Sequence, residues 1–443
     1  MRRVLLIAYQ FPPVGGAGVQ RAVKFTKYLP EHGWDVSVLT VSNPSVPLND
    51  NSLLADIPPQ TVIRRAKTLE PDYRTKQSVS TTSSAGGKQR LMSRIKQSIR
   101  KAAMLLLQPD PNILWVPQAI RQGKQLLREI PHDAILVTGP PFSSFLVGAS
   151  LSRKAKLPLT LDYRDEWTIS NRYWENKSRN PLADRFQRYL QKRVLRQASM
   201  VIATTQRSAE ALSQETLAAG HGIPVRCLYN GFDADDGFVQ PTHATRPPDA
   251  RFRLSHVGTL WNLTTVRPLV EAIEQLSRTQ PDLSAQLEVE MVGRCTEQEL
   301  ATLNRLQGLP CTFLRREYVD HTAAVEVMVN ADELCLLLSD VPGAERVMPG
   351  KTFEYLATGR PVLAIAPPGE MRDVLHGFAG VAEFSPQDVD GIRAHLARRI
   401  TARAVGEHYS RDVSRFDRQQ QAGELAEALD CVAASSETKG RVQ

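Results

Sequence analysis

The stretch that sets the fold covers residues 4–40 and reads "VLLIAYQFPPVGGAGVQRAVKFTKYLPEHGWDVSVLT". It begins with an apolar run of strand length at 4–8. A Pro/Gly loop then leads into a segment with the apolar spacing of a helix, which ends at Gly33. Residues 35–40 form the next expected strand. A strand, a glycine loop, a helix and a second strand make a βαβ unit, whose crossover requires a parallel sheet.

The same alternation recurs along the rest of the chain. Further strands, each followed by a polar or glycine-containing loop, are expected at 133–139, 157–165, 199–205 and 224–231. A second series is expected at 253–259, 287–293, 311–315, 333–339 and 361–367. The polar, proline-rich segment 239–250 between the two series is typical of a linker. The sequence therefore predicts an α/β protein with two doubly wound, Rossmann-like parallel-sheet domains whose strand-end loops face a central cleft.

The composition is that of a folded protein with anionic partners. A length of 443 residues suits two domains of about 200 residues each. The apolar share of 42% beside 23% charged residues argues against disorder as the dominant state. The formal net charge of +8 favours nucleotides, phosphates or an acidic membrane surface as partners. Because zinc-finger spacings, basic heptads and RNP-like strands are missing from the sequence, we expect no nucleic-acid partner.

The cysteines and the N-terminus indicate the compartment. The five cysteines lie far apart without a C-x-x-C pair, which is typical of free thiols in a reducing cytosol. The first apolar run, only about five residues long, is shorter than a signal-peptide core and ends in Pro-Pro. No stretch approaches the roughly 18 apolar residues that span a bilayer. We therefore expect a cytoplasmic protein, with peripheral association at the inner face of the plasma membrane as an option.

Two segments depart from the α/β pattern. Residues 77–89 are poor in hydrophobic side chains, which predicts a flexible segment. Residues 90–107 have the pattern of a basic amphipathic helix, with Leu91, Ile95 and Ile99 among lysines and arginines. Such a helix can lie on an anionic membrane surface, or it can pack in the core with a solvated basic face. The sequence gives these two interpretations equal weight.

The first glycine loop is a candidate phosphate site. Gly15, Gly16 and Gly18 stand between the first strand and the helix that follows. Glycine allows positive φ and close backbone approach, and the helix N-terminus offers free N–H groups to an anion. The pattern predicts a diphosphate ligand, with an unliganded tight turn as the alternative. The spacing is not G-x-G-x-x-G and the next strand lacks a ribose-binding acid, which disfavours NAD.

The second domain carries a similar set of residues at its strand ends. Gly258 and Thr259 follow one strand, Gly293 and Arg294 follow another, and Arg267 opens a helix. Together they can supply close backbone approach and positive charge to a phosphate. The alternative for each arginine is a solvated surface side chain.

A carboxylate stands at the start of another helix of that domain. In "PGKTFEYLATG", residues 349–359, the helix is expected to start near Lys351 and to end at Gly359. Glu354 falls in the first turn, where the helix dipole favours a carboxylate, and a carboxylate can accept hydrogen bonds from the paired hydroxyls of a ribose. Gly350 and Lys351 can contact phosphate oxygens. The alternative is that Glu354 only stabilises the start of its helix.

A dense group of charges follows a strand of the first domain. "LDYRDEWT", residues 161–168, contains Asp162, Arg164 and Asp165. These residues form either an internal ion-pair network or a site that grips a polyhydroxylated acceptor and supplies an acid or base. The sequence leaves both interpretations open.

Four motifs in one order resemble a known family. "FPPVGGAGVQR", "LDYRDEW", "NGFDADD" and "PGKTFEYLATGRPVLA" resemble the family 4, group 1 glycosyltransferases of the GT-B fold, above all bacterial members that build envelope or exopolysaccharide glycans. The resemblance implies sugar transfer from a nucleotide-diphosphate sugar to a glycan or lipid-linked acceptor, usually with retention, without a metal or a further cofactor. It also implies that Glu354 binds the ribose and that the glycine loop meets the phosphate or sugar of the donor.

The sequence departs from the family pattern at one acid. The family often carries E-x(7)-E, but the first of these positions is Arg346 here, and Glu345 is one step off. This keeps open a catalytically silent GT-B-like protein that binds a nucleotide or glycan and supports a partner enzyme. A GT-B nucleotide-sugar epimerase is a second alternative of the same fold, which the motifs disfavour. The D-x-D at 233–235 follows a turn sequence and is interpreted as a turn motif rather than a metal site.

The resemblance also suggests how the domains divide the work. We expect an acceptor-side domain at 1–245 and a donor-binding domain at 250–405. A C-terminal helix at 406–432 is expected to cross back to the first domain, followed by a disordered tail at 433–443.

Overall fold

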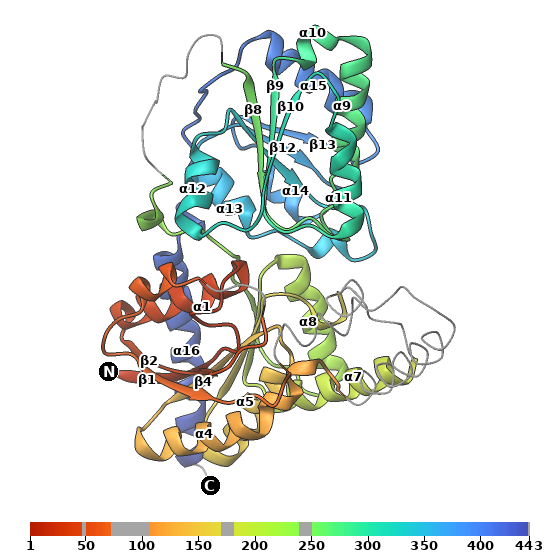
Figure 1. Ribbon diagram of the computed structural model, residues 1–443. Helices are drawn as coiled ribbons and strands as arrows, with labels where there is room; N and C mark the ends of the chain where they lie inside the picture. Colours follow the sequence, from red (N-terminus) through yellow and green to blue (C-terminus); the bar gives the residue numbers. More distant parts are fainter. Residues whose placement is uncertain (47–49, 72–106, 170–180, 239–249, 442–443) are drawn as a thin grey trace. The chain divides into compact units, whose positions relative to one another are not determined.

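The computed structural model describes residues 1–46, 50–71, 107–169, 181–238 and 250–441. The segment predicted at 77–89 therefore lies outside the described residues, as do the segment predicted at 90–107 and the linker at 239–250 except for Leu107 and Ala250. The chain forms two compact units: unit 1 is Met1–Tyr229 with Gln421–Gln443, and unit 2 is Asn230–Gln420 (Figure 1).

Unit 1 contains a seven-stranded parallel sheet in the order β3-β2-β1-β4-β5-β6-β7. Its strands are β1 Arg2–Ile7, β2 Trp34–Val41, β3 Val62–Ala66, β4 Ala134–Gly139, β5 Leu159–Tyr163, β6 Met200–Ala203 and β7 Val225–Cys227. The central strands are nearly continuous apolar runs because helices cover both faces of the sheet. The strand order reverses between β1 and β4, so the loops after these two strands diverge and leave room for a ligand.

The helices of unit 1 pack on the two faces of this sheet. They are α1 Ala17–Tyr28, α4 Val116–Glu129, α5 Ser143–Ala155, α7 Pro181–Leu195, α8 Gln206–Ala218 and α16 Arg418–Arg441. Side chains from α4, α5, α7 and α8 share one apolar cluster with Leu5 and Ile7 of β1. Side chains from α1 and α16 share the other with Val4 and Leu6. Successive side chains of β1 point to opposite faces of the sheet and thus contribute to two separate apolar cores.

Unit 2 contains a six-stranded parallel sheet in the order β10-β9-β8-β11-β12-β13. Its strands are β8 Phe252–Val257, β9 Leu287–Val292, β10 Thr312–Arg316, β11 Glu333–Leu337, β12 Val362–Ile365 and β13 Val381–Phe384. Its helices are α9 Arg267–Thr279, α10 Pro281–Ser284, α11 Glu297–Leu303, α12 His321–Val329, α13 Lys351–Ala357, α14 Glu370–Leu375 and α15 Val389–Thr401. The order reverses between β8 and β11, which makes a second switch point.

The structure confirms the predicted fold class, two doubly wound parallel-sheet units. Each strand expected from the sequence is present, with ends shifted by a few residues. Two strands, β3 and β13, were not predicted. Both contain half-buried residues at the edge of a sheet, so neither has the continuous apolar run that marks a central strand.

The C-terminal segment differs from the expectation of a helix at 406–432. The helix α16 begins only at Arg418, because the side chain of Asp417 accepts a hydrogen bond from the backbone N–H of Gln419 at 2.7 Å. Before it, Arg411 donates to backbone carbonyls of unit 2, among them Ala379 at 2.8 Å. The expected disordered tail at 433–443 is also wrong as far as Arg441, since the helix continues to that residue and buries Ala433.

The chain passes from unit 1 to unit 2 earlier than the domain boundary expected at 245. Unit 1 ends at Tyr229, directly after β7. Phe232 already belongs to unit 2, where its backbone N–H donates to Phe416 at 3.1 Å and its carbonyl accepts from Arg418 at 2.9 Å. This backbone pairing fixes the chain in unit 2 before the polar segment begins.

Candidate functional site

The glycine loop of unit 1 lies at the carboxyl end of β1. Gly16 precedes α1 with φ 101°, a conformation that favours glycine. At Gly18 a Cβ atom would lie 2.3 Å from Oε1 of Gln10 and 2.6 Å from Nη1 of Arg164. Gly15 and Gly18 are half-buried. A side chain at position 18 would therefore displace the ends of Gln10 and Arg164, while Gly15 and Gly16 leave backbone accessible.

Arg164, which follows β5, makes hydrogen bonds to the loops that follow β1 and β4. Its guanidinium contacts the carbonyl oxygens of Gly18, after β1, and of Pro140, after β4. It also donates to Oε1 of Gln10 at 3.0 Å. Burial lowers the pKa of Arg164, and the neighbouring Asp165 and Asp162 act in the opposite direction. An arginine held by three acceptors positions the glycine loop and is not placed to move a proton.

Asp162 forms a buried ion pair with Arg21 of α1. Its side chain is fully buried, and Nη2 of Arg21 lies 2.9 Å from Oδ1. The same guanidinium donates to the carbonyl oxygens of Leu228 at 3.1 Å and Tyr229 at 2.8 Å. Of the two interpretations that the sequence left open for Asp162, this geometry supports the internal ion-pair network.

Asp165 differs from Asp162 in its surroundings. It lies just beyond β5, and its carboxylate makes no hydrogen bond within the part of the chain that the structure describes. Its side chain reaches solvent, yet desolvation by its surroundings raises the pKa of the carboxyl, and the charge of Arg164 acts in the opposite direction. Of the three charged residues expected to act on an acceptor, Asp165 is thus the one whose carboxylate remains available as an acid or base.

In unit 2 two strand-end loops meet backbone against backbone. Gly293, after β9, has φ +128°, and a Cβ atom there would lie 2.1 Å from the carbonyl oxygen of Gly258, after β8. The loops continue to pair, since the N–H of Leu260 donates to the carbonyl of Arg294 at 2.8 Å. Thr259 between them is exposed. Only glycine at 293 permits this approach, so the two loops form one rigid platform at the switch point.

Helix α13 brings Glu354 and Lys351 together near the carboxyl end of β8. Glu354 is 4% exposed, and Nζ of Lys351 contacts its carboxylate. Gly350 caps the helix and is half-buried. The hydroxyl of Tyr355 accepts a hydrogen bond from the N–H of Val257 at 2.7 Å and donates to the carbonyl of the same residue at 3.3 Å. Burial raises the pKa of this phenol, so it stays protonated and fixes α13 to the end of β8.

A buried histidine lies beneath the same platform. His256 donates from Nδ1 to the carbonyl oxygen of Cys335 at 2.8 Å. Its Nε2 makes no hydrogen bond to any described residue and borders a small hollow next to Gly258 and Gly293. Burial lowers the pKa of His256 to about 4, so the ring is neutral at physiological pH. Neither His256 nor Tyr355 was predicted, because each is an isolated residue within an ordinary apolar pattern.

Two of the three predicted cations of unit 2, Arg267 and Arg294, differ from Lys351 in being exposed. Arg267, the first residue of α9, and Arg294, after β9, are both exposed, and neither forms an ion pair with a described residue. Glu345, the displaced acid, accepts a hydrogen bond from the N–H of Gly343 at 2.9 Å and lies 3.6 Å from Nη1 of Arg346. Glu345 is thus turned back onto its own loop.

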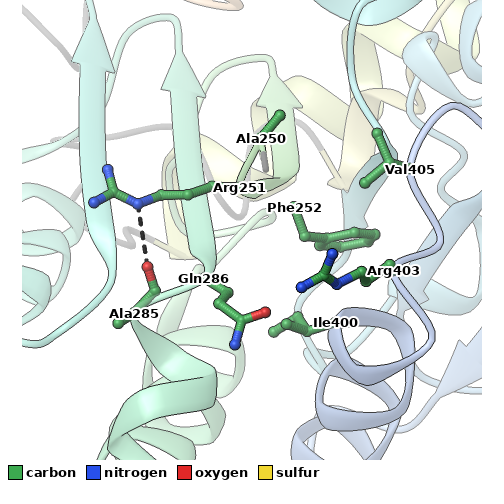
Figure 2. A pocket seen from close by; sticks show the side chains of 8 residues that line it. All are labelled: Ala250, Arg251, Phe252, Ala285, Gln286, Ile400, Arg403 and Val405. Carbon is green, nitrogen blue, oxygen red and sulfur yellow. Dashed lines mark hydrogen bonds between the residues drawn. The ribbon is translucent and has the colours of Figure 1, made fainter. Parts of the chain in front are cut away.

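Other features of the described residues lie apart from these loops. They contain no group of three or more His, Cys, Asp or Glu side chains placed to hold a metal ion. None of the described helices combines the length and apolar character needed to cross a bilayer. A hollow of about 310 Å³ lies at the amino end of β8, opposite the strand ends that bind ligands in such sheets (Figure 2). It is lined by Ala250, Arg251, Phe252, Ala285, Gln286, Ile400, Arg403 and Val405.

Comparison with known proteins agrees with this geometry. Residues 15–231 match the glycosyl transferase 4-like domain. Sucrose-phosphate synthase from Thermosynechococcus elongatus superposes with a TM-score of 0.58 at 15% identity, over 100% of this chain and 98% of that chain. Anabaena HepE in complex with UDP and glucose gives 0.57 at 16% identity, over 100% of both chains. WaaG, a glycosyltransferase involved in lipopolysaccharide biosynthesis, gives 0.54 at 13% identity, over 99% of both. No curated protein sequence matches.

The two parallel sheets, each with a reversal of strand order that makes a switch point, define a two-domain α/β protein of the GT-B fold. Residues 15–231 form a glycosyl transferase 4-like domain, and the chain is therefore a glycosyltransferase of the GT-B fold.

Proposed function

We propose that the enzyme transfers a sugar from a nucleotide-diphosphate sugar to a glycan or lipid-linked acceptor, with retention at the anomeric carbon and without a metal or further cofactor. The setting we propose is cell-surface polysaccharide synthesis in bacteria, in the cytoplasm at the inner face of the plasma membrane. Two similar structures support this: HepE was solved with UDP and with UDP-glucose, and WaaG takes part in lipopolysaccharide biosynthesis.

The observation that carries the proposal is the buried pair of Glu354 and Lys351. A carboxylate that is 4% exposed needs a hydrogen-bonding partner, and here the lysine fills that role. In the proposal, paired ribose hydroxyls take the place of the ammonium group on Glu354. Lys351, whose side chain is 17% exposed, then turns to the diphosphate of the same donor. One ligand thus satisfies both partners of the pair.

The proposed chemistry depends on positive charge near the leaving group. A nucleoside diphosphate gains negative charge as the glycosidic bond breaks, and fixed cations stabilise that charge in the transition state. Lys351 and the exposed Arg267 and Arg294 are the candidates, with close backbone approach from Gly258, Thr259, Gly293 and Gly350. In this proposal they serve the role that a divalent metal has in other glycosyltransferases.

On the acceptor side the proposal assigns separate roles to neighbouring residues of unit 1. Gly15 and Gly16 offer accessible backbone to the donor phosphate or sugar, with Gly18 and Arg164 holding their loop in place. Asp165 is the proposed acid or base for the acceptor hydroxyl, because its carboxylate is exposed and not engaged by a described residue.

Product release tests the reaction class. The protein is incubated with a panel of nucleotide sugars, with and without lipid-linked acceptors, and with EDTA, and the release of nucleoside diphosphate is followed. We expect acceptor-dependent release that survives EDTA. Interconversion of two nucleotide sugars would instead show an epimerase. Nucleotide binding with no turnover for any acceptor would indicate a protein that supports a partner enzyme.

The ribose role of Glu354 is tested by Glu354→Gln. We expect the Kd for a nucleoside diphosphate, measured by calorimetry, to rise by roughly ten- to a hundredfold, since a charged hydrogen-bond acceptor is lost. Glu333→Gln is the control: this glutamate is also buried, but it is the first residue of β11 and so lies at the amino end of that strand, away from the carboxyl ends that carry the candidate site. It should lower stability and leave Kd unchanged. A folded Glu354→Gln protein with wild-type affinity would contradict the proposal.

A further inference from the structure

The hollow at the amino end of β8 combines an apolar wall with positive charge (Figure 2). Its volume of about 310 Å³ falls near the lower end of the range for small-molecule sites, which is about 300–1,000 Å³. Phe252, Ile400 and Val405 contribute the larger apolar side chains of its wall. Two arginines, Arg251 and Arg403, are also among its lining residues, and no acidic side chain is. These properties suit a small ligand that is both apolar and anionic.

The two arginines differ in whether their hydrogen-bond donors are already in use. Nε of Arg251 donates to the carbonyl oxygen of Ala285 at 3.1 Å, and its Nη1 donates to Oγ1 of Thr312 at 2.6 Å. The guanidinium of Arg403 points into the hollow beside the ring of Phe252 (Figure 2). It forms no hydrogen bond or ion pair with a described residue. Arg251 therefore belongs to the wall, and Arg403 can offer its donors to a ligand.

The backbone of Arg403 has a conformation that disfavours arginine. Its φ is 48°, and among the described non-glycine residues only Lys156 shares a positive φ. Arg403 lies two residues after the last residue of α15, at the position where a helix commonly ends in a left-handed glycine. A side chain there costs conformational energy that glycine would avoid. Because stability alone would favour glycine, the arginine indicates a role for its guanidinium.

The aromatic wall of the hollow is held in place by residues outside it. Phe252 is buried, and the centroid of its ring lies 5.7 Å from Cζ of Arg399, which is not a lining residue. Nη1 of Arg399 in turn lies 2.6 Å from a carboxylate oxygen of Glu407. Since this wall is already ordered, a ligand does not have to order it on binding.

We propose that the hollow binds a small organic monocarboxylate with a flat apolar body. The planar guanidinium of Arg403 can donate to both carboxylate oxygens, and the ring of Phe252 offers an apolar surface to the body of the ligand. Gln286 lines the same hollow, and its Nε2 donates to the carbonyl oxygen of Asp282 at 3.4 Å. The second N–H of that amide is a further donor for the carboxylate.

A single negative charge fits the hollow better than two. Of the two lining guanidiniums, only that of Arg403 has no described partner. The hollow also lies at the C-terminal end of α15, which carries a partial negative charge and opposes a highly charged anion. A phosphate monoester carries about 1.5 to 2 negative charges at pH 7, whereas a carboxylate carries one. A carboxylate is therefore favoured over a phosphate.

This site is separate from the candidate donor site. The hollow begins at Phe252, the first residue of β8, whereas Gly258 and Gly293 follow the carboxyl ends of β8 and β9. None of the lining residues has a role in the proposed sugar transfer. Carboxylate binding therefore does not rest on the proposed function, and either proposal can fail alone.

Ligand-observed NMR titrations of the full chain test this site. Benzoate is the probe, benzamide is its neutral counterpart, and inorganic phosphate and phenyl phosphate test the choice of anion. A nucleoside diphosphate is present throughout in excess, so that benzoate bound at the proposed donor site is not counted. We expect benzoate to bind with a Kd of about 1 mM and benzamide to bind at least about tenfold more weakly.

Two single substitutions of exposed residues remove the proposed contacts. Arg403→Gly deletes the guanidinium and relieves the positive φ, so the variant should melt no lower than the wild type. The Kd for benzoate should rise at least about tenfold in this variant. Gln286→Glu places a carboxylate in the hollow, where it competes with the ligand for Arg403, and should raise the Kd by a similar factor.

Each variant has a matched control. Lys156→Gly, at the C-terminal end of α5 in unit 1, relieves a φ of 56° and removes a cation outside the hollow. Gln298→Glu adds the same charge at an exposed position of α11. Both controls should bind benzoate as the wild type does.

Four results would overturn the proposal. The wild type does not bind benzoate, or it binds benzamide as tightly, which would leave no role for the charge of Arg403. Phenyl phosphate or inorganic phosphate binds more tightly than benzoate, which would assign the hollow to phosphates. The Kd for benzoate stays unchanged in Arg403→Gly or in Gln286→Glu, which would place the bound benzoate elsewhere on the chain.

Discussion

At the scale of single residues, two acids three positions apart have opposite surroundings. Asp162 is the penultimate residue of β5, fully buried, and its carboxylate is held by Arg21. Asp165 lies beyond the end of the strand and is exposed. Because a buried carboxylate that already forms an ion pair is a poor proton carrier, stability and catalysis are expected to divide between these two residues.

Substituting the two acids one at a time should separate these roles. Asp162→Asn leaves the guanidinium of Arg21 buried without its countercharge, and should lower the free energy of unfolding of unit 1 by about 3 kcal/mol. Asp165→Asn should change it by less than about 0.5 kcal/mol, because the side chain is exposed. Chemical denaturation measures both changes, and kcat should fall sharply in Asp165→Asn. The assignment is wrong if Asp162→Asn is stable and inactive while Asp165→Asn is fully active.

The sequence could not make this distinction. The partner of Asp162 is Arg21, which is 141 residues away in the chain, so no local pattern announces the pair. The same holds for Gly18: its glycine pattern indicated a phosphate loop, but the atoms that a side chain there would meet first belong to Gln10 and Arg164. Local motifs indicated loops that lie at strand ends, and only the folded arrangement shows which members of each loop face solvent.

At the scale of secondary-structure elements, the switch point of unit 2 lies between β8 and β11, and the side chain of Tyr355 binds the end of β8 there. β8 pairs with β11 only at Leu254 and Ser255, and the two strands separate beyond them. Further along β8, at Val257, the hydroxyl of Tyr355 supplies hydrogen bonds in place of β11: it accepts from the N–H and donates to the carbonyl. Since Tyr355 follows Glu354 directly, this contact sets where the proposed ribose ligand lies relative to the platform of Gly258 and Gly293.

Tyr355→Phe should therefore lower the stability of unit 2 and weaken the binding of a nucleoside diphosphate. Loss of the hydroxyl leaves the backbone N–H of Val257 without this partner, which should cost about 1–2 kcal/mol in the stability of unit 2. The Kd for a nucleoside diphosphate should rise by more than the change in stability explains, because α13 loses its anchor on β8. Tyr409→Phe removes a hydroxyl that binds Glu407 at the surface and is the control. Equal nucleotide affinity in Tyr355→Phe and wild type would show that α13 is positioned by its apolar side chains instead.

The sequence predicts the strands best where helices cover both faces of the sheet. The central strands β1, β4, β8 and β11 are nearly continuous apolar runs, and their predicted positions are confirmed. The edge strands β3 and β13 have half-buried residues and no such run. The start of α16 was placed too early because residues 409–417 carry no proline to end a helix pattern. The carbonyl contacts of Arg411 and the cap of Asp417, which exclude a helix there, are tertiary and local contacts that periodicity does not report.

At the scale of the whole molecule, the chain leaves unit 1 after Tyr229 and returns to it at Gln421. The returning helix α16 buries Leu425 and Leu429 against α1 and against Val4 and Leu6 of β1. Its Asp430 also accepts hydrogen bonds from Arg2 at 2.7 Å and from the indole of Trp34 at 3.1 Å. The last part of the chain thus completes the core that the first part begins, and unit 1 cannot finish folding before α16 has been synthesised.

This arrangement predicts that a defect in α16 weakens unit 1 and spares unit 2. Leu429→Ala removes a fully buried side chain and should destabilise unit 1 by about 3 kcal/mol. Native-state hydrogen exchange resolves the two units: slow amides of β1 and β4 should lose protection, while those of β8 and β11 should keep theirs. Leu276→Ala, an equally buried leucine of α9 in unit 2, should give the reverse pattern. If Leu429→Ala lowered protection equally in both units, the two would unfold as one cooperative body, and the stability of each could no longer be treated as its own.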